Sequence, residues 1–279
     1  MTRPEPSAGP SASVSGAGPP AQGEGSQAVR YERAGAAAVI TIDRQHRRNA
    51  VDGPTAAALH EAYLRFEAEE EARVLVLTGA GGISFCAGAD LKEQESFRGR
   101  LMAPEGPMGF TRLTPSKPAI AAISGFCLAG GLELALWCDL RVATEGSVFG
   151  CPERRWGVPL IDGGTQRLPR IVGLGRALDL ILTGRLLDAQ EALAMGLLTE
   201  VVAPGGHLQR ALELAEGLAG FPQATMLADR RAAIEGFSMG LAEGLALEAA
   251  HGPEVFEDGA RGAERFVAGE GRGGAGAGA

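Results

Sequence analysis

The sequence predicts an α/β fold whose carboxyl-terminal part is helical. Short apolar runs rich in β-branched residues alternate with segments of helical spacing up to about residue 163, and helical spacing dominates after that point. The chain has 279 residues, of which 45% are hydrophobic, so it can bury one sizeable core. We therefore expect one α/β domain with a helical extension from about residue 205, not two folding units.

The strands expected in the first half are short and apolar. One helix is expected at 54–71, before the second strand. The prediction rests on Leu59, Ala62, Tyr63 and Phe66, which recur at helical spacing. The expected strands cover residues 36–42, 73–78, 119–123, 140–144 and 148–149.

The second half reads as a series of helices interrupted by one strand, 198–202. The expected helices cover residues 165–172, 176–182, 189–195, 207–218, 224–234, 241–250 and 260–267. The two ends, 1–28 and 269–279, are low in complexity and cannot bury enough apolar surface to offset their ordering entropy. We expect both to be disordered, which leaves 29–268 as the folded domain.

Charge and cysteine content exclude several classes of function. With 34 acidic and 26 basic residues the net charge is −8, which repels the phosphates of nucleic acids and of anionic membranes. The uncharged stretch 118–132 is too short to span a bilayer. The four cysteines and four histidines show neither metal-ligand spacing nor a disulfide framework. We expect a cytoplasmic protein that binds no metal.

Two local motifs suggest other enzymes, but their context argues against both. Residues 236–240 match the G-x-S-x-G pattern of serine hydrolases, yet the predicted flanks are both helical, so we interpret the motif as a helix–helix corner. Residues 74–84 resemble a strand entering a dinucleotide-binding glycine loop. Position 84 is serine, however, and no helix follows, so a nicotinamide enzyme is not expected.

A first segment with chemical potential is 85–93, FCAGADLKE. Gly88 permits an unusual turn, and Asp90 with Glu93 resembles a capping box that opens a helix. Free backbone N–H groups are therefore expected near Ala89. A capped helix after a loop would explain the segment equally well.

A second segment, 124–137, places paired glycines at the start of a helix. The N–H of Gly130 or Gly131 should point outward with the positive end of the helix dipole behind it, which suits an anion. Glu133 lies one turn into this helix among apolar neighbours, so it should be buried. A buried carboxylate is a candidate acid or base, or else it is paired with an arginine.

A third segment, 149–168, contains two further acidic candidates. Glu153 follows a proline and could favour a helical first turn or pair with Arg154 or Arg155. Asp162 precedes two glycines and could be the N-cap of the next helix.

Taken together and in this order, the motifs resemble the crotonase superfamily, the enoyl-CoA hydratase/isomerase family. They run from about residue 36 to 266 as IDR…RNAV, FCAGADLKE, SGFCLAGGLELALWCDLR, FGCPE, GGTQRLPRIVG, LTGR and ALAMGLLTEVV. The resemblance implies a spiral of ββα units with a C-terminal helical region that mediates trimers, often paired into hexamers. It also implies an acyl-CoA thioester substrate and no cofactor, because coenzyme A is part of the substrate.

The resemblance also assigns roles to residues. It implies that the N–H groups of Ala89 and Gly130 form an oxyanion hole and that Glu133 and Glu153 are the catalytic glutamates, with Glu133 as base and Glu153 exchanging a proton with Cα. The implied substrate-binding residues are Ala87, Gly88, Ala89, Asp90, Leu91, Lys92 and Gly130.

These assignments predict syn addition of water to a trans-2-enoyl-CoA. Asp162 stands where hydratases of this family usually have a proline-glycine turn, and it is a candidate third acid. Isomerisation of an enoyl-CoA or dienoyl-CoA by Glu153 and Asp162 is therefore an alternative, and a non-catalytic binding or scaffold protein is a second. The segment 94–112, where the family sets acyl-chain selectivity, follows no readable pattern.

Overall fold

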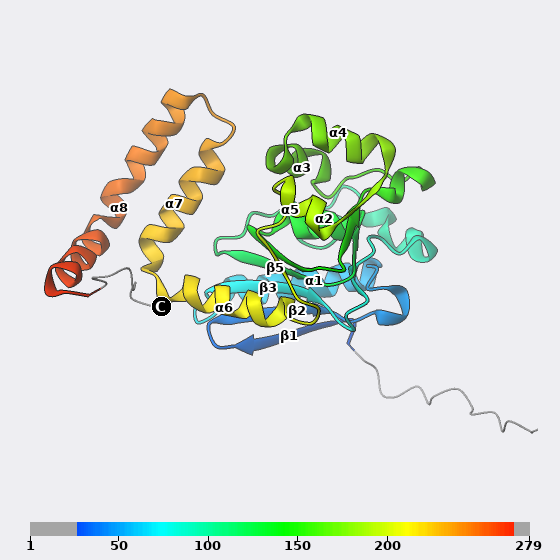
Figure 1. Ribbon diagram of the computed structural model, residues 1–279, viewed down its shortest axis with the longest axis horizontal. Helices are drawn as coiled ribbons and strands as arrows, with labels where there is room; N and C mark the ends of the chain where they lie inside the picture. Colours follow the sequence, from blue (N-terminus) through cyan, green and yellow to red (C-terminus); the bar gives the residue numbers. More distant parts are fainter. Residues whose placement is uncertain (1–26, 271–279) are drawn as a thin grey trace, which may run out of the picture.

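The computed structural model describes residues 27–270. The two predicted tails therefore lie outside the described residues, apart from residues 27–28 and 269–270. A twisted mixed sheet and a smaller sheet form the body, and the last two helices stand beside it as a hairpin (Figure 1). Within the described residues, no helix combines the length and the apolar character that crossing a membrane would need.

The larger sheet has six strands in the order β1-β2-β3-β5-β7-β10. They are β1 (Val29–Ala34), β2 (Ala37–Ile42), β3 (Val74–Gly79), β5 (Ala119–Ile123), β7 (Leu140–Thr144) and β10 (Glu200–Val202). Strand β1 pairs antiparallel with β2, and the others pair in parallel. Strands β2, β3 and β5 are buried throughout, as expected of parallel strands covered on both faces.

The smaller sheet has four strands in the order β4-β6-β8-β9. They are β4 (Ser84–Cys86), β6 (Phe126–Leu128), β8 (Val148–Gly150) and β9 (Leu186–Asp188). The chain passes through three pairs of strands, β3–β4, β5–β6 and β7–β8. In each pair the first strand belongs to the larger sheet and the second to the smaller sheet, and a helical segment follows. This repeated winding is the predicted spiral of ββα units, which is confirmed.

Eight α-helices and three 3₁₀ segments complete the described chain. The α-helices are α1 (Gly53–Ala68), α2 (Gly130–Trp137), α3 (Gly164–Val172), α4 (Leu174–Thr183), α5 (Ala189–Ala194), α6 (His207–Gly220), α7 (Gln223–Gly236) and α8 (Leu241–Ala268). The 3₁₀ segments are η1 (Gln45–Arg47), η2 (Leu91–Arg100) and η3 (Pro152–Trp156). Helix α6 covers one face of the larger sheet, where Ala211 and Ala215 pack in one cluster with Ile120.

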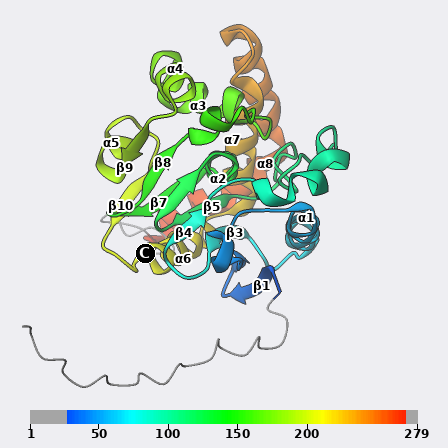
Figure 2. The same ribbon diagram turned by 90° about the vertical axis from the view of Figure 1, so that its right-hand side faces the viewer.

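Two sequence expectations about these elements were wrong. Strands β1, β4, β6 and β9 were not predicted, and the last three are only three residues long, too short for a periodic signal. Helices expected at 241–250 and 260–267 form one helix, α8, which continues through Pro253. The corner predicted at 236–240 is confirmed, since it joins α7 to α8, which lie side by side in Figures 1 and 2.

Candidate active site

The candidate site is a pocket of about 750 Å³ at the carboxyl ends of β4, β6 and β8. The loops that follow these parallel strands all line it, which is where open α/β sheets place their ligands. The sequence-predicted residues that line the pocket are Ala87, Ala89, Asp90, Leu91, Gly130, Glu133, Glu153 and Asp162. Two further predicted residues, Gly88 and Lys92, are outside its lining. Among the described residues, no group of His, Cys, Asp and Glu side chains could hold a metal ion.

Two backbone N–H groups face this pocket from segments that approach each other closely. Gly88 has φ +95°, and a Cβ on it would lie 3.0 Å from the backbone nitrogen of Gly130. A Cβ on Gly131 would lie 2.0 Å from the carbonyl oxygen of Cys86, so only glycine fits there. Within the described chain, the N–H groups of Ala89 and Gly130 have no hydrogen-bond acceptor. They are free to donate to a ligand.

Ala89 is held in place by its neighbours on both sides. The Val51 N–H donates to the carbonyl of Gly88 at 2.9 Å, and the Asp90 N–H donates to the carbonyl of Val51 at 2.7 Å. These two bonds fix the peptide groups before and after Ala89 and leave its own N–H unpaired.

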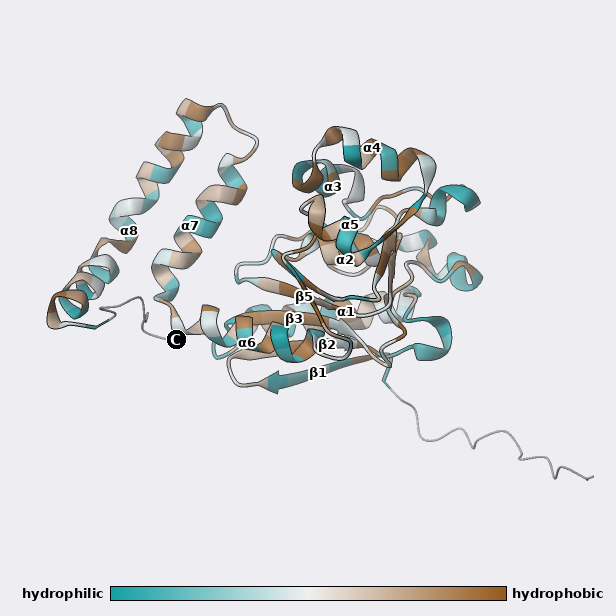
Figure 3. Cartoon of the chain, viewed as in Figure 1, coloured by the Kyte–Doolittle hydropathy of each residue, from teal (hydrophilic) through white to brown (hydrophobic). Residues whose placement is uncertain are grey.

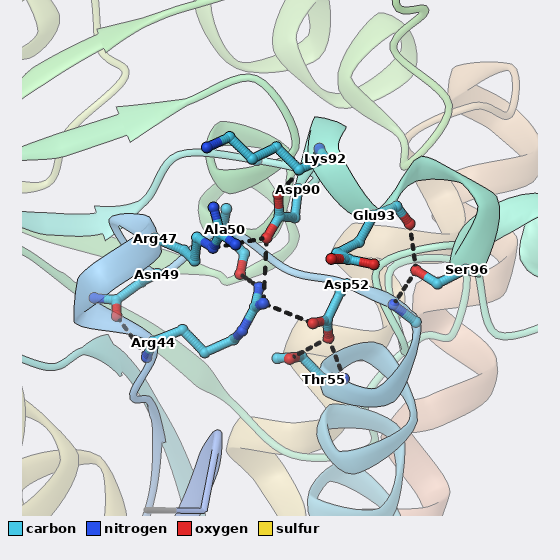
Figure 4. Close-up of polar contacts among 12 residues, drawn as sticks. Arg44, Arg47, Asn49, Ala50, Asp52, Thr55, Asp90, Lys92, Glu93 and Ser96 are labelled. Carbon is cyan, nitrogen blue, oxygen red and sulfur yellow. Dashed lines mark hydrogen bonds and ion pairs between the residues drawn. The ribbon is translucent and has the colours of Figure 1, made fainter. Parts of the chain in front are cut away.

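The same loop is anchored by the nearly buried Arg44 (Figure 4). Its Nη2 lies 2.6 Å from Oδ2 of Asp52 and 3.2 Å from Oδ2 of Asp90. Asp52 caps α1, and Asp90 caps η2 through the N–H of Lys92. Asp90 thus caps a helical segment as predicted, but the capping box with Glu93 is not formed, because the Asp90 N–H donates to Val51. Arg44 couples this cap to the start of α1. Sequence reasoning missed Arg44, although it lies in the IDR motif.

Glu133 is buried in the first turn of α2, as predicted, with 3% of its surface exposed. Its Oε1 accepts the N–H groups of Asp162 at 2.9 Å and Gly164 at 2.7 Å, and it has no ion pair with an arginine of the described chain. Burial, reinforced by the charge of Asp162, raises the pKa of Glu133 to about 8 even though the two N–H donors oppose the shift. The arginine-paired alternative is therefore wrong.

Glu153 lies in η3 and is also buried. Neither of its carboxylate oxygens has a hydrogen-bond partner among the described residues, and neither Arg154 nor Arg155 forms an ion pair with it. Burial raises the pKa of Glu153 above its usual value. A buried carboxylate without partners is costly, and such groups mark functional sites more often than structural ones.

Asp162 is not the N-cap that its position before two glycines suggested. Gly163, with φ +102°, precedes α3 and makes no side-chain cap, so the Asp162 side chain points elsewhere. Its Oδ1 accepts the N–H of Met108 at 2.9 Å and the hydroxyl of Thr111. Burial raises the pKa of Asp162, while these two donors oppose the shift. Met108 and Thr111 were not predicted, because they lie in the segment 94–112 that shows no pattern.

Comparison with known proteins gives consistent matches in sequence and in fold. The sequence model of the enoyl-CoA hydratase/isomerase family matches residues 32–268. The chain is 37% identical over 232 residues to a short-chain-enoyl-CoA hydratase of Clostridium acetobutylicum, covering 82% of this chain and 89% of that protein. It is 40% identical over 248 residues to a probable enoyl-CoA hydratase of Rhizobium meliloti, covering 87% and 95%. The crystal structure of enoyl-CoA hydratase EchA1 from Mycobacterium marinum matches it with a TM-score of 0.81 and 36% identity, covering 86% of this chain and 95% of that one.

Proposed function

The chain belongs to the enoyl-CoA hydratase/isomerase family and is an enoyl-CoA hydratase-type enzyme, and on that premise we propose that it adds water, in the syn sense, across the double bond of a trans-2-enoyl-CoA. The observation that carries the proposal is the pair of buried carboxylates, Glu133 and Glu153, that line one pocket with two unpaired backbone N–H groups. An acyl-CoA thioester is the substrate class.

The two N–H groups would stabilise the charge that develops during hydration. Attack of water on the β-carbon pushes electron density onto the thioester oxygen, which becomes enolate-like. Donors from Ala89 and Gly130 are already oriented and cost no reorganisation at that moment. Loss of one such donor typically costs about 3 kcal/mol of transition-state stabilisation.

The two carboxylates would divide the proton transfers. Water must lose a proton as it attacks, and Cα must gain one. Both N–H bonds to Glu133 fall on Oε1, so Oε2 is left to take a proton from water. Neither oxygen of Glu153 has a competing partner among the described residues, so its carboxyl is free to exchange a proton with Cα.

Hydration of crotonyl-CoA tests this proposal directly. The conjugated thioester should lose its ultraviolet absorbance when the protein is added. Replacing a positioned acid or base typically lowers rates by about 10²–10⁴-fold, so Glu133→Gln and Glu153→Gln should each reduce kcat to that extent. Glu145→Gln, a change of an exposed carboxylate on the loop after β7, is the matched control. Wild-type protein that consumes no enoyl-CoA would contradict the proposal.

Double-bond isomerisation is the second candidate, favoured by the buried Asp162 in the same pocket. An isomerase needs an acid or base that moves a proton along the acyl chain without adding water. A 3-enoyl-CoA and a dienoyl-CoA offered to the same preparation separate the two reactions. Conversion without mass gain would identify isomerisation. A gain of one water from the 3-enoyl-CoA would identify isomerisation followed by hydration, because water adds only to a double bond conjugated with the thioester. No conversion of the 3-enoyl-CoA by a preparation that hydrates crotonyl-CoA would identify hydration alone.

A further inference from the structure

The chain between η2 and β5 forms no regular element, yet its centre is buried. Met108 and Thr111 are 1% and 0% exposed, and Phe110 between them is fully buried. A loop buried to this degree needs partners for its polar groups. The partners of Met108 and of the Thr111 side chain and carbonyl come from one short segment, 161–167, which leads into α3.

Four hydrogen bonds join the two segments, and a fifth braces segment 161–167 internally. Oδ1 of Asp162 accepts from the N–H of Met108 at 2.9 Å and from the hydroxyl of Thr111. Arg167 donates to the carbonyls of Asp162 at 3.0 Å and of Thr111 at 2.6 Å. Arg112 donates to the carbonyl of Ile161 at 3.2 Å. Asp162 accepts two of the four bonds between the segments and also the internal bond from Arg167, so it is the centre of the connection.

Met108 connects this network to the reacting end of the pocket. Its Sδ and Cε lie 3.2 Å and 3.1 Å from the position that a Cβ on Gly130 would occupy. The side chain therefore covers the glycine whose N–H is the proposed oxyanion donor. Met108 also lines the pocket beside Phe97 and Leu101. A shift of Met108 would alter both the width of the acyl pocket and the surroundings of that N–H.

The backbone of Asp162 reaches the second part of the site. Its N–H donates to Oε1 of Glu133 at 2.9 Å. The same residue thus holds the proposed base through its backbone and the apolar wall through its side chain. The side-chain bonds require only an oxygen that accepts two hydrogen bonds, and the amide oxygen of asparagine meets that requirement.

We propose that Asp162 is a positioning residue that holds Met108 as the wall of the acyl pocket and thereby determines which acyl chains the enzyme accepts. The proposal rests on the proposed hydration of enoyl-CoA thioesters. Met108, Phe97 and Leu101 all line the pocket, so the acyl group proposed to contact them is apolar.

Three variants separate positioning from proton transfer. Asp162→Ala removes the acceptor, Thr111→Val removes one donor with little change in shape, and Asp162→Asn keeps the acceptor but cannot exchange a proton. The assay is kcat and KM for C4, C8 and C10 trans-2-enoyl-CoA. We expect Asp162→Ala and Thr111→Val to change the C4-to-C10 ratio of kcat/KM by about tenfold, mainly through KM, and Asp162→Asn to restore the wild-type ratio.

A binding measurement keeps the test independent of the reaction. Titration calorimetry with butyryl-CoA and decanoyl-CoA, which cannot be hydrated, should show the same change in preference and the same rescue. If the wild-type enzyme hydrated no enoyl-CoA, the proposed function would be wrong, but the calorimetric comparison of butyryl-CoA with decanoyl-CoA would still test the role of Asp162. If Thr111→Val and Asp162→Ala, folded by circular dichroism, keep the wild-type preference, the proposal is wrong. It is also wrong if Asp162→Asn fails to restore the ratio, because proton transfer by Asp162 would then be required.

Discussion

At the scale of single residues, the burial of Glu133 makes stability depend on pH. Its pKa rises from the usual 4.5 to about 8 in the folded chain, so the folded state binds the proton more tightly than the unfolded state. The associated stability is fully present below about pH 4.5 and is lost as pH rises through about 8. One pKa unit corresponds to about 1.4 kcal/mol, so the loss can reach a few kcal/mol.

Glu133→Gln should remove this dependence. Glutamine keeps the oxygen that accepts the N–H groups of Asp162 and Gly164, but it carries no charge at any pH. We expect the variant to match wild type at about pH 4 and to exceed it at about pH 9 by about 2–4 kcal/mol in the free energy of unfolding. Urea titrations at both pH values measure the difference, with Glu145→Gln as control. If wild type and Glu133→Gln had the same free energy of unfolding at pH 9, burial of the Glu133 carboxylate would cost no stability.

The sequence was most informative for residues whose environment is local. Gly130 and Glu133 lie within one turn of one helix, so paired glycines and apolar neighbours were enough to predict an outward N–H and a buried carboxylate. Asp162 was misjudged because its partner Thr111 is 51 positions away, beyond any local pattern. Ala129, at φ +52° before α2, was also beyond prediction, because alanine gives no sign that the backbone turns into the left-handed region there.

At the scale of elements, Arg44 links the caps of two helical segments. Burial alone would raise the pKa of Asp52, but hydrogen bonds from Thr55 and the charge of Arg44 lower it below its usual value. Without Arg44, Asp52 would lose its ion pair at the start of α1, and the buried Asp90 would keep only the longer contact with Arg47 at 3.8 Å. Breaking one side of a buried ion pair typically costs about 3 kcal/mol or more.

We therefore expect Arg44→Met to lower the free energy of unfolding by about 3 kcal/mol and to raise KM, since the loop that carries Ala89 loses its anchor. Chemical unfolding and kinetics with crotonyl-CoA measure the two effects. The control is Arg210→Met, which breaks exposed ion pairs with Glu200 and Glu213 and should change neither quantity. Similar results for both variants would mean that the Arg44 network contributes no more than a surface pair.

Element prediction succeeded where burial is uniform and failed where elements are very short. Strands expected at 119–123 and 140–144 coincide with β5 and β7, because buried parallel strands read as continuous apolar runs. Strands β4 and β6 have three residues each and are specified by pairing with each other, which is a long-range property. These short strands carry the glycine loops of the site, so sequence analysis found the loops without the sheet that positions them.

At the scale of the whole molecule, the hairpin of α7 and α8 is largely exposed to solvent. None of the residues of α8, all within the described chain, is buried. Leu241, Leu245, Phe256 and Phe266 are all more than half exposed. Figure 3 shows hydrophobic positions recurring along this helix. Apolar side chains that gather on one exposed element mark an interaction surface, and the predicted trimer would cover it with further copies of this chain.

Contacts through α8 would be apolar, and salt does not screen apolar contacts. The assembly should therefore withstand the repulsion between chains that each carry a net charge of −8, even when low salt leaves that repulsion unscreened. We expect light scattering after size-exclusion chromatography to give three or six times the 28.7 kDa chain mass, at low and high salt alike. Leu241→Glu with Phe256→Glu would place carboxylates in an apolar interface and should reduce the mass to that of one chain. Glu264→Gln, at an exposed polar position on the same helix, should leave the assembly intact. A wild-type mass of one chain would show that α8 is exposed in solution as well.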